Sequence, residues 1–139
     1  MWGTGSARNM PLKLSLKPGE AVVVNEAVIR NGERRGTMLL ETKARILRER
    51  DVMFPEDVLT PHDAAYFALM QMYIVGETSG QLYDAAITAL TDLLEKSTDQ
   101  TERDAVLRIA QLVAAGDLYK ALGGCRKLLK TVLAEADHA

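Results

Sequence analysis

Few side chains in this sequence have the types and the spacing that catalysis requires. The two histidines, His62 and His138, have no serine or cysteine beside them in a recognisable nucleophile motif. The single cysteine, Cys125, cannot form an internal disulfide, and no second Cys or His cluster lies near it to complete a zinc site. We therefore expect a protein that is not an enzyme and that uses no metal or cofactor.

Arginine side chains are the groups with chemistry to offer, and they gather in the first half of the chain. Their guanidinium groups bind phosphate in a forked geometry and stack on unpaired bases, so a sheet that carries several is a credible RNA surface. Glu33, Glu41, Glu49 and Asp51 interleave with them, and exposed strands carry such mixed charge simply to keep their edges from pairing. The pattern leaves both interpretations open. The set comprises Arg30, Arg34, Arg35, Arg45, Arg48 and Arg50, of which all but Arg30 are candidate RNA contacts.

Charge is distributed unevenly, although the net charge is only −2. Residues 11–53 contain nine Lys and Arg against six Asp and Glu, whereas residues 54–139 contain seven against thirteen. We expect a basic β-rich module over 10–53 and an acidic α-helical module over 54–139. Residues 1–9, rich in Gly, Ser and Thr, are interpreted as a leader before a native start at Met10.

Alternation of apolar and polar residues predicts strands in the basic module. The first is Leu12–Leu16, where leucine occupies every second position. Further strands are expected at Ala21–Val24, Ala27–Arg30, Arg35–Glu41 and Lys43–Arg48. Asn31-Gly32 predicts a type I′ hairpin turn between the third and fourth strands. Five short strands so close together indicate a meander or a small barrel.

After Phe54 the apolar period changes from two to about 3.6, which indicates helices. Residues Thr60–Asp63 predict a helix start, with threonine as N-cap and proline in the first turn, and this helix should run to Val75 and stop at Gly76. Apolar spacing predicts two more helices, and a fourth should begin after Asp117. The expected fold class is α+β: a small five-stranded antiparallel β module packed on a three- to four-helix bundle.

Three blocks of the chain resemble the FlbT family of flagellar regulators. They are Met10–Glu20 (MPLKLSLKPGE), Asn25–Gly32 (NEAVIRNG) and Leu39–Glu49 (LLETKARILRE). The resemblance implies a repressor of flagellum biosynthesis in alphaproteobacteria that acts after transcription and associates with the 5′ untranslated region of flagellin mRNA. It also implies partnership with the flagellar protein FlaF.

The β module is also similar in layout to the RNA-binding carbon-storage regulator CsrA. The similarity comes from Leu12-x-Leu14, then Gly19-Glu20, then Leu47-Arg48-Glu49. That family binds RNA between its first strand and the arginine-bearing end of its last strand. Carried over by position, the resemblance nominates Leu12, Lys13, Leu14 and Arg48.

We thus expect a cytoplasmic regulator that binds the flagellin mRNA leader without performing chemistry. The alternative is a protein-binding adaptor, in which the helical half grips a FlaF-like protein or flagellin without touching RNA. No apolar run approaches the roughly 20 residues that cross a bilayer, so no membrane partner is expected. Association into a homo-oligomer stays open.

Overall fold

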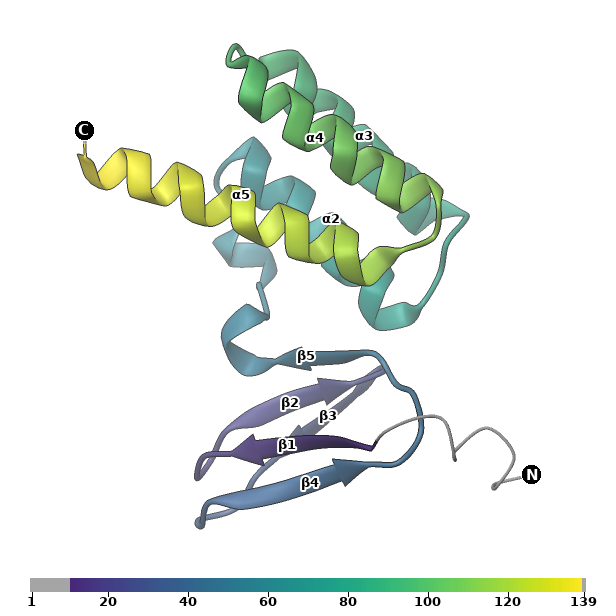
Figure 1. Cartoon of the computed structure of the whole chain (residues 1–139), viewed down its shortest axis with the longest axis vertical. Coiled ribbons are helices and arrows are strands. Elements are labelled where there is room, and N and C mark those ends of the chain that lie inside the picture. The colour runs from purple at the N-terminus through teal and green to yellow at the C-terminus, as the bar shows by residue number, and fades with distance from the viewer. Residues whose placement is uncertain (1–10, 139) are drawn as a thin grey trace. The chain divides into compact units, whose positions relative to one another are not determined.

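Within residues 11–138, five short strands are followed by four α-helices. Figure 1 shows their arrangement along the chain. The computed structural model describes residues 11–138, with side chains for residues 11–134. The chain divides into two compact units, Met1–Val52 and Met53–Ala139, called here the β unit and the helical unit. The predicted α+β class is confirmed. The interpretation of residues 1–9 as a leader, and of Met10 as a native start, lies outside the described residues.

The strands of the β unit form two small antiparallel sheets. The strands are β1 (Leu12–Leu16), β2 (Ala21–Val24), β3 (Ala27–Arg30), β4 (Gly36–Leu40) and β5 (Ile46–Arg48). Strand β1 pairs with β4, and the second sheet has the order β3-β2-β5. The prediction of a meander or a barrel is therefore wrong. Only β2 and β3 pair as neighbours in sequence, whereas β1 pairs with β4 and β2 also pairs with β5. Alternation within a strand carries no information about which strand lies beside it.

The apolar residues of both sheets build one small core in the β unit. Leu14, Leu16 and Val22 are buried at its centre. Partly buried residues of β2, β4 and β5 surround them: Val24, Met38, Leu40 and Ile46. Because each strand alternates its side chains between two faces, Lys13 and Ser15 of β1 lie exposed on the opposite side. The leucine alternation in β1 thus identified the buried face correctly.

The predicted Asn31-Gly32 hairpin is wrong. Strand β3 returns to β2 through the two-residue turn Asn25-Glu26, where Asn25 has a φ of 55°, and β3 does not pair with β4. Gly32 has no positive φ, as a type I′ turn would require. Residues 31–35 instead cross from one sheet to the other. The positive φ occurs instead in the preceding turn, at Asn25, which is followed by glutamate and not by glycine.

Strand β5 is shorter than predicted, and a single helical turn follows it. It begins at Ile46 instead of Lys43, and the turn η1 (Glu49–Asp51) is a 3-10 helix. A second such turn, η2 (Pro55–Asp57), precedes the first α-helix. Arg50 therefore lies in this helical turn and not on a strand.

The helical unit contains α2 (Pro61–Val75), α3 (Gln81–Lys96), α4 (Gln100–Ala114) and α5 (Leu118–His138). The start of α2 is the predicted capping box, in which the Thr60 hydroxyl accepts the Asp63 N–H and the Asp63 carboxylate accepts the Thr60 N–H. Gly76 ends this helix with a φ of 80°, a conformation that glycine adopts without a steric penalty. Asp117 accepts the Lys120 N–H and caps α5 as expected.

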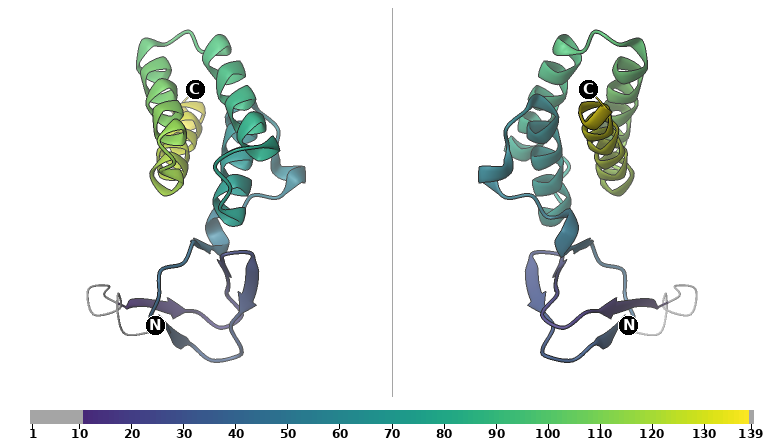
Figure 2. Two further views of the ribbon diagram at one scale, coloured as in Figure 1. Left: turned by 90° about the vertical axis from the view of Figure 1, so that its right-hand side faces the viewer. Right: turned by 90° about the vertical axis from the view of Figure 1, so that its left-hand side faces the viewer.

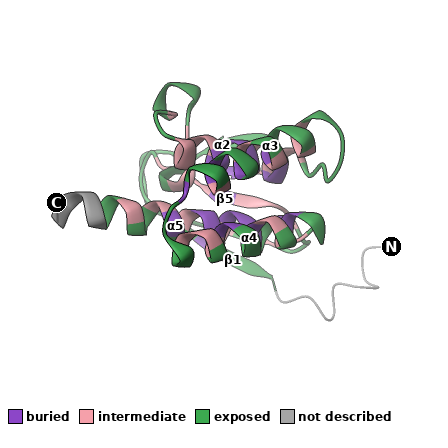
Figure 3. Ribbon diagram, turned by 90° about the horizontal axis from the view of Figure 1, so that it is seen from above, coloured by how far each residue is buried: buried purple, intermediate pink, exposed green. Residues whose placement is uncertain are grey.

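Each of these helices packs against two others. Helix α2 contacts α3 and α5, and α4 also contacts both of them. Figure 2 shows α4 (green) next to α5 (yellow). The buried positions of the helices face the interior of the unit (Figure 3). They include Leu69, Met72, Leu93, Val106, Val113 and Leu122. Within residues 11–138, no helix is long and apolar enough to cross a membrane.

Cys125 should not react with iodoacetamide at about pH 8 while the protein is folded, because the thiolate is the reactive form. The residue is 1% exposed, and burial raises the pKa of its thiol to about 12 despite the nearby Arg126 charge. Mass spectrometry should find no alkylation of the native protein and complete alkylation after unfolding in denaturant. Rapid labelling of the native protein would contradict the buried position.

Candidate nucleic-acid interface

The turn between β1 and β2 organises the polar end of the β unit. The Glu20 N–H donates to the Lys17 carbonyl at 3.0 Å, and the Glu20 carboxylate accepts the Lys17 N–H at 2.8 Å. Gly19 occupies the turn with a φ of 71°, where a side chain would be strained. The carbonyl groups of this tight turn are therefore fixed in position, and side chains from other segments donate hydrogen bonds to them.

Asn31 connects the crossing segment 31–35 to this turn. Its side-chain amide donates to the carbonyls of Leu16 at 3.2 Å, Lys17 at 2.8 Å and Arg34 at 2.9 Å. Its backbone N–H donates to the Glu20 carbonyl at 2.8 Å. The Arg34 backbone is thereby held beside Lys17, and the exposed side chains of residues 34 and 35 start from this end of the β unit.

Arg48 joins the two sheets at the same end. Its guanidinium donates to the Ser15 carbonyl of β1 at 3.1 Å and lies 3.6 Å from the Glu20 carboxylate. The hydrogen bond from Lys17, and then the charges of Arg48, Lys17 and Arg50, hold the pKa of Glu20 below its ordinary value. The Arg48 guanidinium thus already has two partners within the β unit, which leaves fewer of its N–H groups available to phosphate.

Two further basic residues reach the turn from other elements. Arg30 donates from its guanidinium to the Gly19 carbonyl at 2.6 Å. Arg50 lies exposed in η1, which is fixed to β2 because the Glu49 carboxylate accepts the Ala21 N–H at 2.6 Å. We call this group the basic end of the β unit. It comprises Lys17, Arg30, Arg34, Arg35, Arg48 and Arg50.

The basic end keeps an excess of positive charge in spite of its acidic neighbours. Glu20 and Glu49 lie among the arginines, but both carboxylates accept backbone N–H groups as well. Each carboxylate thus stabilises the backbone of the β unit, and the Glu20 carboxylate also forms an ion pair with the Arg48 guanidinium. The exposed Arg34, Arg35 and Arg50 are left as the principal cationic groups with access to a ligand.

The structure separates the remaining candidates from this end. Arg45 precedes β5 beside the opposite turn, where its N–H donates to the Asn25 side chain at 3.0 Å. Leu12 and Lys13 lie at the start of β1, paired with Leu40 and Leu39. Leu14 is 5% exposed and its side chain belongs to the core of the β unit, so its RNA contact stays a prediction from the CsrA layout alone.

Lys17 and Arg30 were not among the residues predicted to bind RNA. The Pro18-Gly19 sequence could have drawn attention to Lys17, because a tight turn exposes its flanks. No pattern near Arg30 reveals that its guanidinium folds back over that turn.

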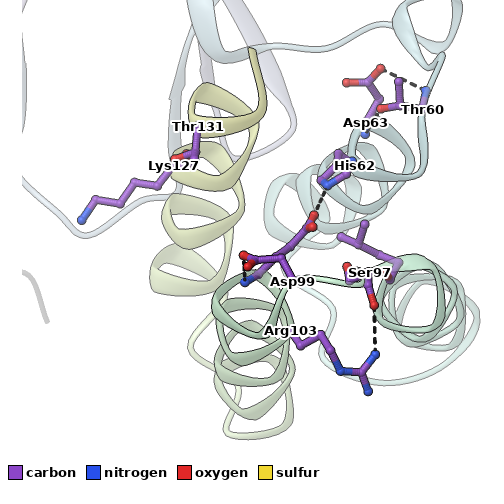
Figure 4. Close-up of polar contacts among 10 residues, drawn as sticks. Thr60, His62, Asp63, Ser97, Asp99, Arg103, Lys127 and Thr131 are labelled. Atoms are coloured by element: carbon purple, nitrogen blue, oxygen red, sulfur yellow. Dashed lines mark hydrogen bonds and ion pairs between the residues drawn. The ribbon is translucent and has the colours of Figure 1, made fainter. Parts of the chain in front are cut away.

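The helical unit has its own polar cluster, shown in Figure 4. The His62 ring, in the first turn of α2, forms a hydrogen bond with the Glu102 carboxylate of α4, and the Asp99 carboxylate accepts the Glu102 N–H at 3.1 Å. Arg103 donates to the carbonyls of Leu94 and Ser97 at the end of α3. These contacts join helix ends. Among the described residues, no group of three or more His, Cys, Asp or Glu could hold a metal ion.

Comparison with known proteins identifies the family. The model of the family described as "Flagellar protein FlbT" matches residues 12–133, which is most of the chain. The chain belongs to the FlbT family. No solved structure shows a significant match.

Curated members of the FlbT family are similar to this chain over most of their length. The Caulobacter vibrioides flagellum biosynthesis repressor protein FlbT is 41% identical over 121 residues, covering 87% of this chain and 86% of the relative. A probable flagellum biosynthesis repressor protein FlbT from Rhodopseudomonas palustris is 32% identical and is covered to 94%. The probable flagellum biosynthesis repressor protein FlbT 1 from Bradyrhizobium diazoefficiens is 33% identical, with 81% of it covered. The match includes both units, so the basic end lies within the family's own sequence.

Proposed function

We propose that this protein represses flagellum biosynthesis after transcription, by binding the 5′ untranslated region of flagellin mRNA through the basic end. Membership of the FlbT family and the names of its relatives support the flagellar role. The protein acts by occupying RNA, and no chemical step is part of the proposal.

The gathering of six cationic side chains around one turn is the observation that carries the RNA contact. They come from β3, β5, η1 and the two connecting segments, yet hydrogen bonds of Asn31, Arg30 and Arg48 hold them at one end. Such a cluster follows a phosphate backbone better than a scatter of charges does. Residues 11–53 contain no Phe, Tyr or Trp. Stacking on bases would therefore fall to the arginine planes, and phosphate contact should dominate the affinity.

The alternative of a protein-binding adaptor is favoured by a groove in the helical unit. The groove lies between α4 and α5 and has a cavity volume of about 1150 Å³. Ile109 and Leu128 are apolar residues of its lining, and Lys127 and Arg108 are basic ones. Such a groove fits an amphipathic helix of a FlaF-like protein or of flagellin. In this alternative any effect on mRNA is indirect.

A titration of purified protein with the flagellin leader RNA distinguishes the two functions. The expected result is binding whose affinity falls steeply between about 50 and 200 mM salt, because phosphate contacts release counterions. A scrambled leader of equal length controls for non-specific attraction. No binding, or binding equal to that of the scrambled RNA, would contradict the proposal and favour the adaptor.

A further inference from the structure

Strand β3 is an edge strand with unusually open side chains. It ends the sheet order β3-β2-β5, and its four residues, Ala27–Arg30, are all exposed. Val28 is 69% exposed and Ile29 is 37% exposed. Ile29 shares a sheet face with its partner Val22, which is fully buried in the core. The core of the β unit is thus open on the side of β3.

The register shows which backbone groups of β3 face outward. Val24 and Ala27 flank the two-residue turn, and the Asn31 N–H donates to the Glu20 carbonyl, so odd-numbered residues of β3 point their N–H and C=O groups toward β2. The N–H and C=O groups of Val28 and Arg30 consequently point away from the sheet. An open edge of this kind is a template for another strand.

In strand β1, by contrast, side chains from other segments form hydrogen bonds with the backbone carbonyl groups. Arg48 donates to the Ser15 carbonyl, and the Asn31 amide donates to the Leu16 carbonyl. Side chains that occupy edge carbonyls discourage pairing with another chain. The two apolar side chains on β3 and its outward-facing backbone make it the better site for strand addition.

We propose that two copies of the chain associate by antiparallel pairing of β3 with β3 of the second copy, centred on Val28. Val28 then lies opposite Val28 of the second copy, and the two residues exchange N–H···O bonds. A two-fold axis requires such a self-complementary surface. The pairing therefore buries the Val28 side chain, the most exposed apolar side chain of the strand, in both copies.

Charge complementarity selects this register and this occupant. With Val28 opposite its own copy, Glu26 lies opposite Arg30 of the second copy on both sides of the axis. Both residues are exposed, and the Arg30 guanidinium has five N–H donors, of which one already serves the Gly19 carbonyl. Opposite charges directly across a strand pair are favourable. A register centred on Ile29 would place Arg30 opposite Val28 and would leave Glu26 without this partner.

Sedimentation velocity of the full chain over a range of concentrations tests the pairing. The wild type should show a concentration-dependent dimer. Val28→Lys should raise the dimer dissociation constant on the order of 100-fold, because symmetry places two ammonium groups at the centre of the interface. Leu39→Lys is the matched control, since Leu39 is an exposed apolar residue on β4, with 57% exposure. A wild type that stays monomeric, or a Val28→Lys dimer of unchanged affinity, would overturn the proposal.

A charge exchange tests the register separately. Glu26→Arg and Arg30→Glu each put like charges opposite one another and should weaken the dimer. The double variant Glu26→Arg/Arg30→Glu restores opposite charges and should recover most of the affinity. Circular dichroism establishes that each variant is folded. If the double variant is as weak as the sum of the single ones predicts, the strands do not pair about Val28.

Discussion

Replacing Leu122 with alanine should lower the free energy of unfolding of the helical unit by about 2–5 kcal/mol, the range for a large-to-small change in a packed core. Leu122 is 1% exposed on α5, the helix that packs against both α2 and α4. Truncation removes apolar contacts and leaves a cavity between helices that relax only in part. Chemical denaturation followed by far-ultraviolet circular dichroism measures the change.

The matched control is Leu133→Ala on the same helix. Leu133 is 64% exposed, so the same loss of methyl groups should change stability by less than about 0.5 kcal/mol. Equal losses for the two variants would show that the interior of the helical unit has been assigned to the wrong face of α5.

Removing three exposed cations from the basic end should weaken leader RNA binding on the order of 100-fold at about 0.1 M salt. The variant is Arg34→Gln/Arg35→Gln/Arg50→Gln. Loss of three phosphate contacts should also reduce the log–log salt slope by about two. Arg48 is left unchanged because its guanidinium holds the Ser15 carbonyl and Glu20, and its replacement would disturb the junction of the two sheets. Filter binding or fluorescence anisotropy at several salt concentrations gives both quantities.

A second triple variant, Lys120→Gln/Lys127→Gln/Lys130→Gln, provides an equal change of charge on the helical unit. It removes cations from the α4–α5 groove and leaves the basic end intact. Under the RNA proposal it should retain most of the affinity and most of the salt slope. If instead this variant loses binding and the arginine variant keeps it, RNA contact belongs to the helical unit.

Local signals made the helices predictable. The cap at Thr60, the proline after it and Gly76 each act through groups within a few residues, so the bounds of α2 follow from short-range chemistry. The strand positions were also largely readable, because alternation reports which residues face a core. Strand pairing could not be predicted, since β1 pairs with β4 through residues twenty or more positions apart.

The candidate site was predictable in its residue type and not in its arrangement. The sequence singled out arginines of the basic half, and the structure gathers Arg34, Arg35, Arg48 and Arg50 near one turn while it places Arg45 at the other. What groups them is a set of side-chain bonds to remote carbonyls, which follow the sheet pairing. A sequence pattern does not contain those bonds until the pairing is known.

The chemical stability of Asn31 depends on the β unit remaining folded. An asparagine followed by glycine is prone to lose its side-chain amide nitrogen, because the next backbone nitrogen can attack the amide carbon. In the folded chain this amide donates to the carbonyls of Leu16, Lys17 and Arg34. Aspartate at the same position would set a negative oxygen against those carbonyls, where acceptor meets acceptor. Each opening of this corner therefore carries a risk of irreversible chemical ageing.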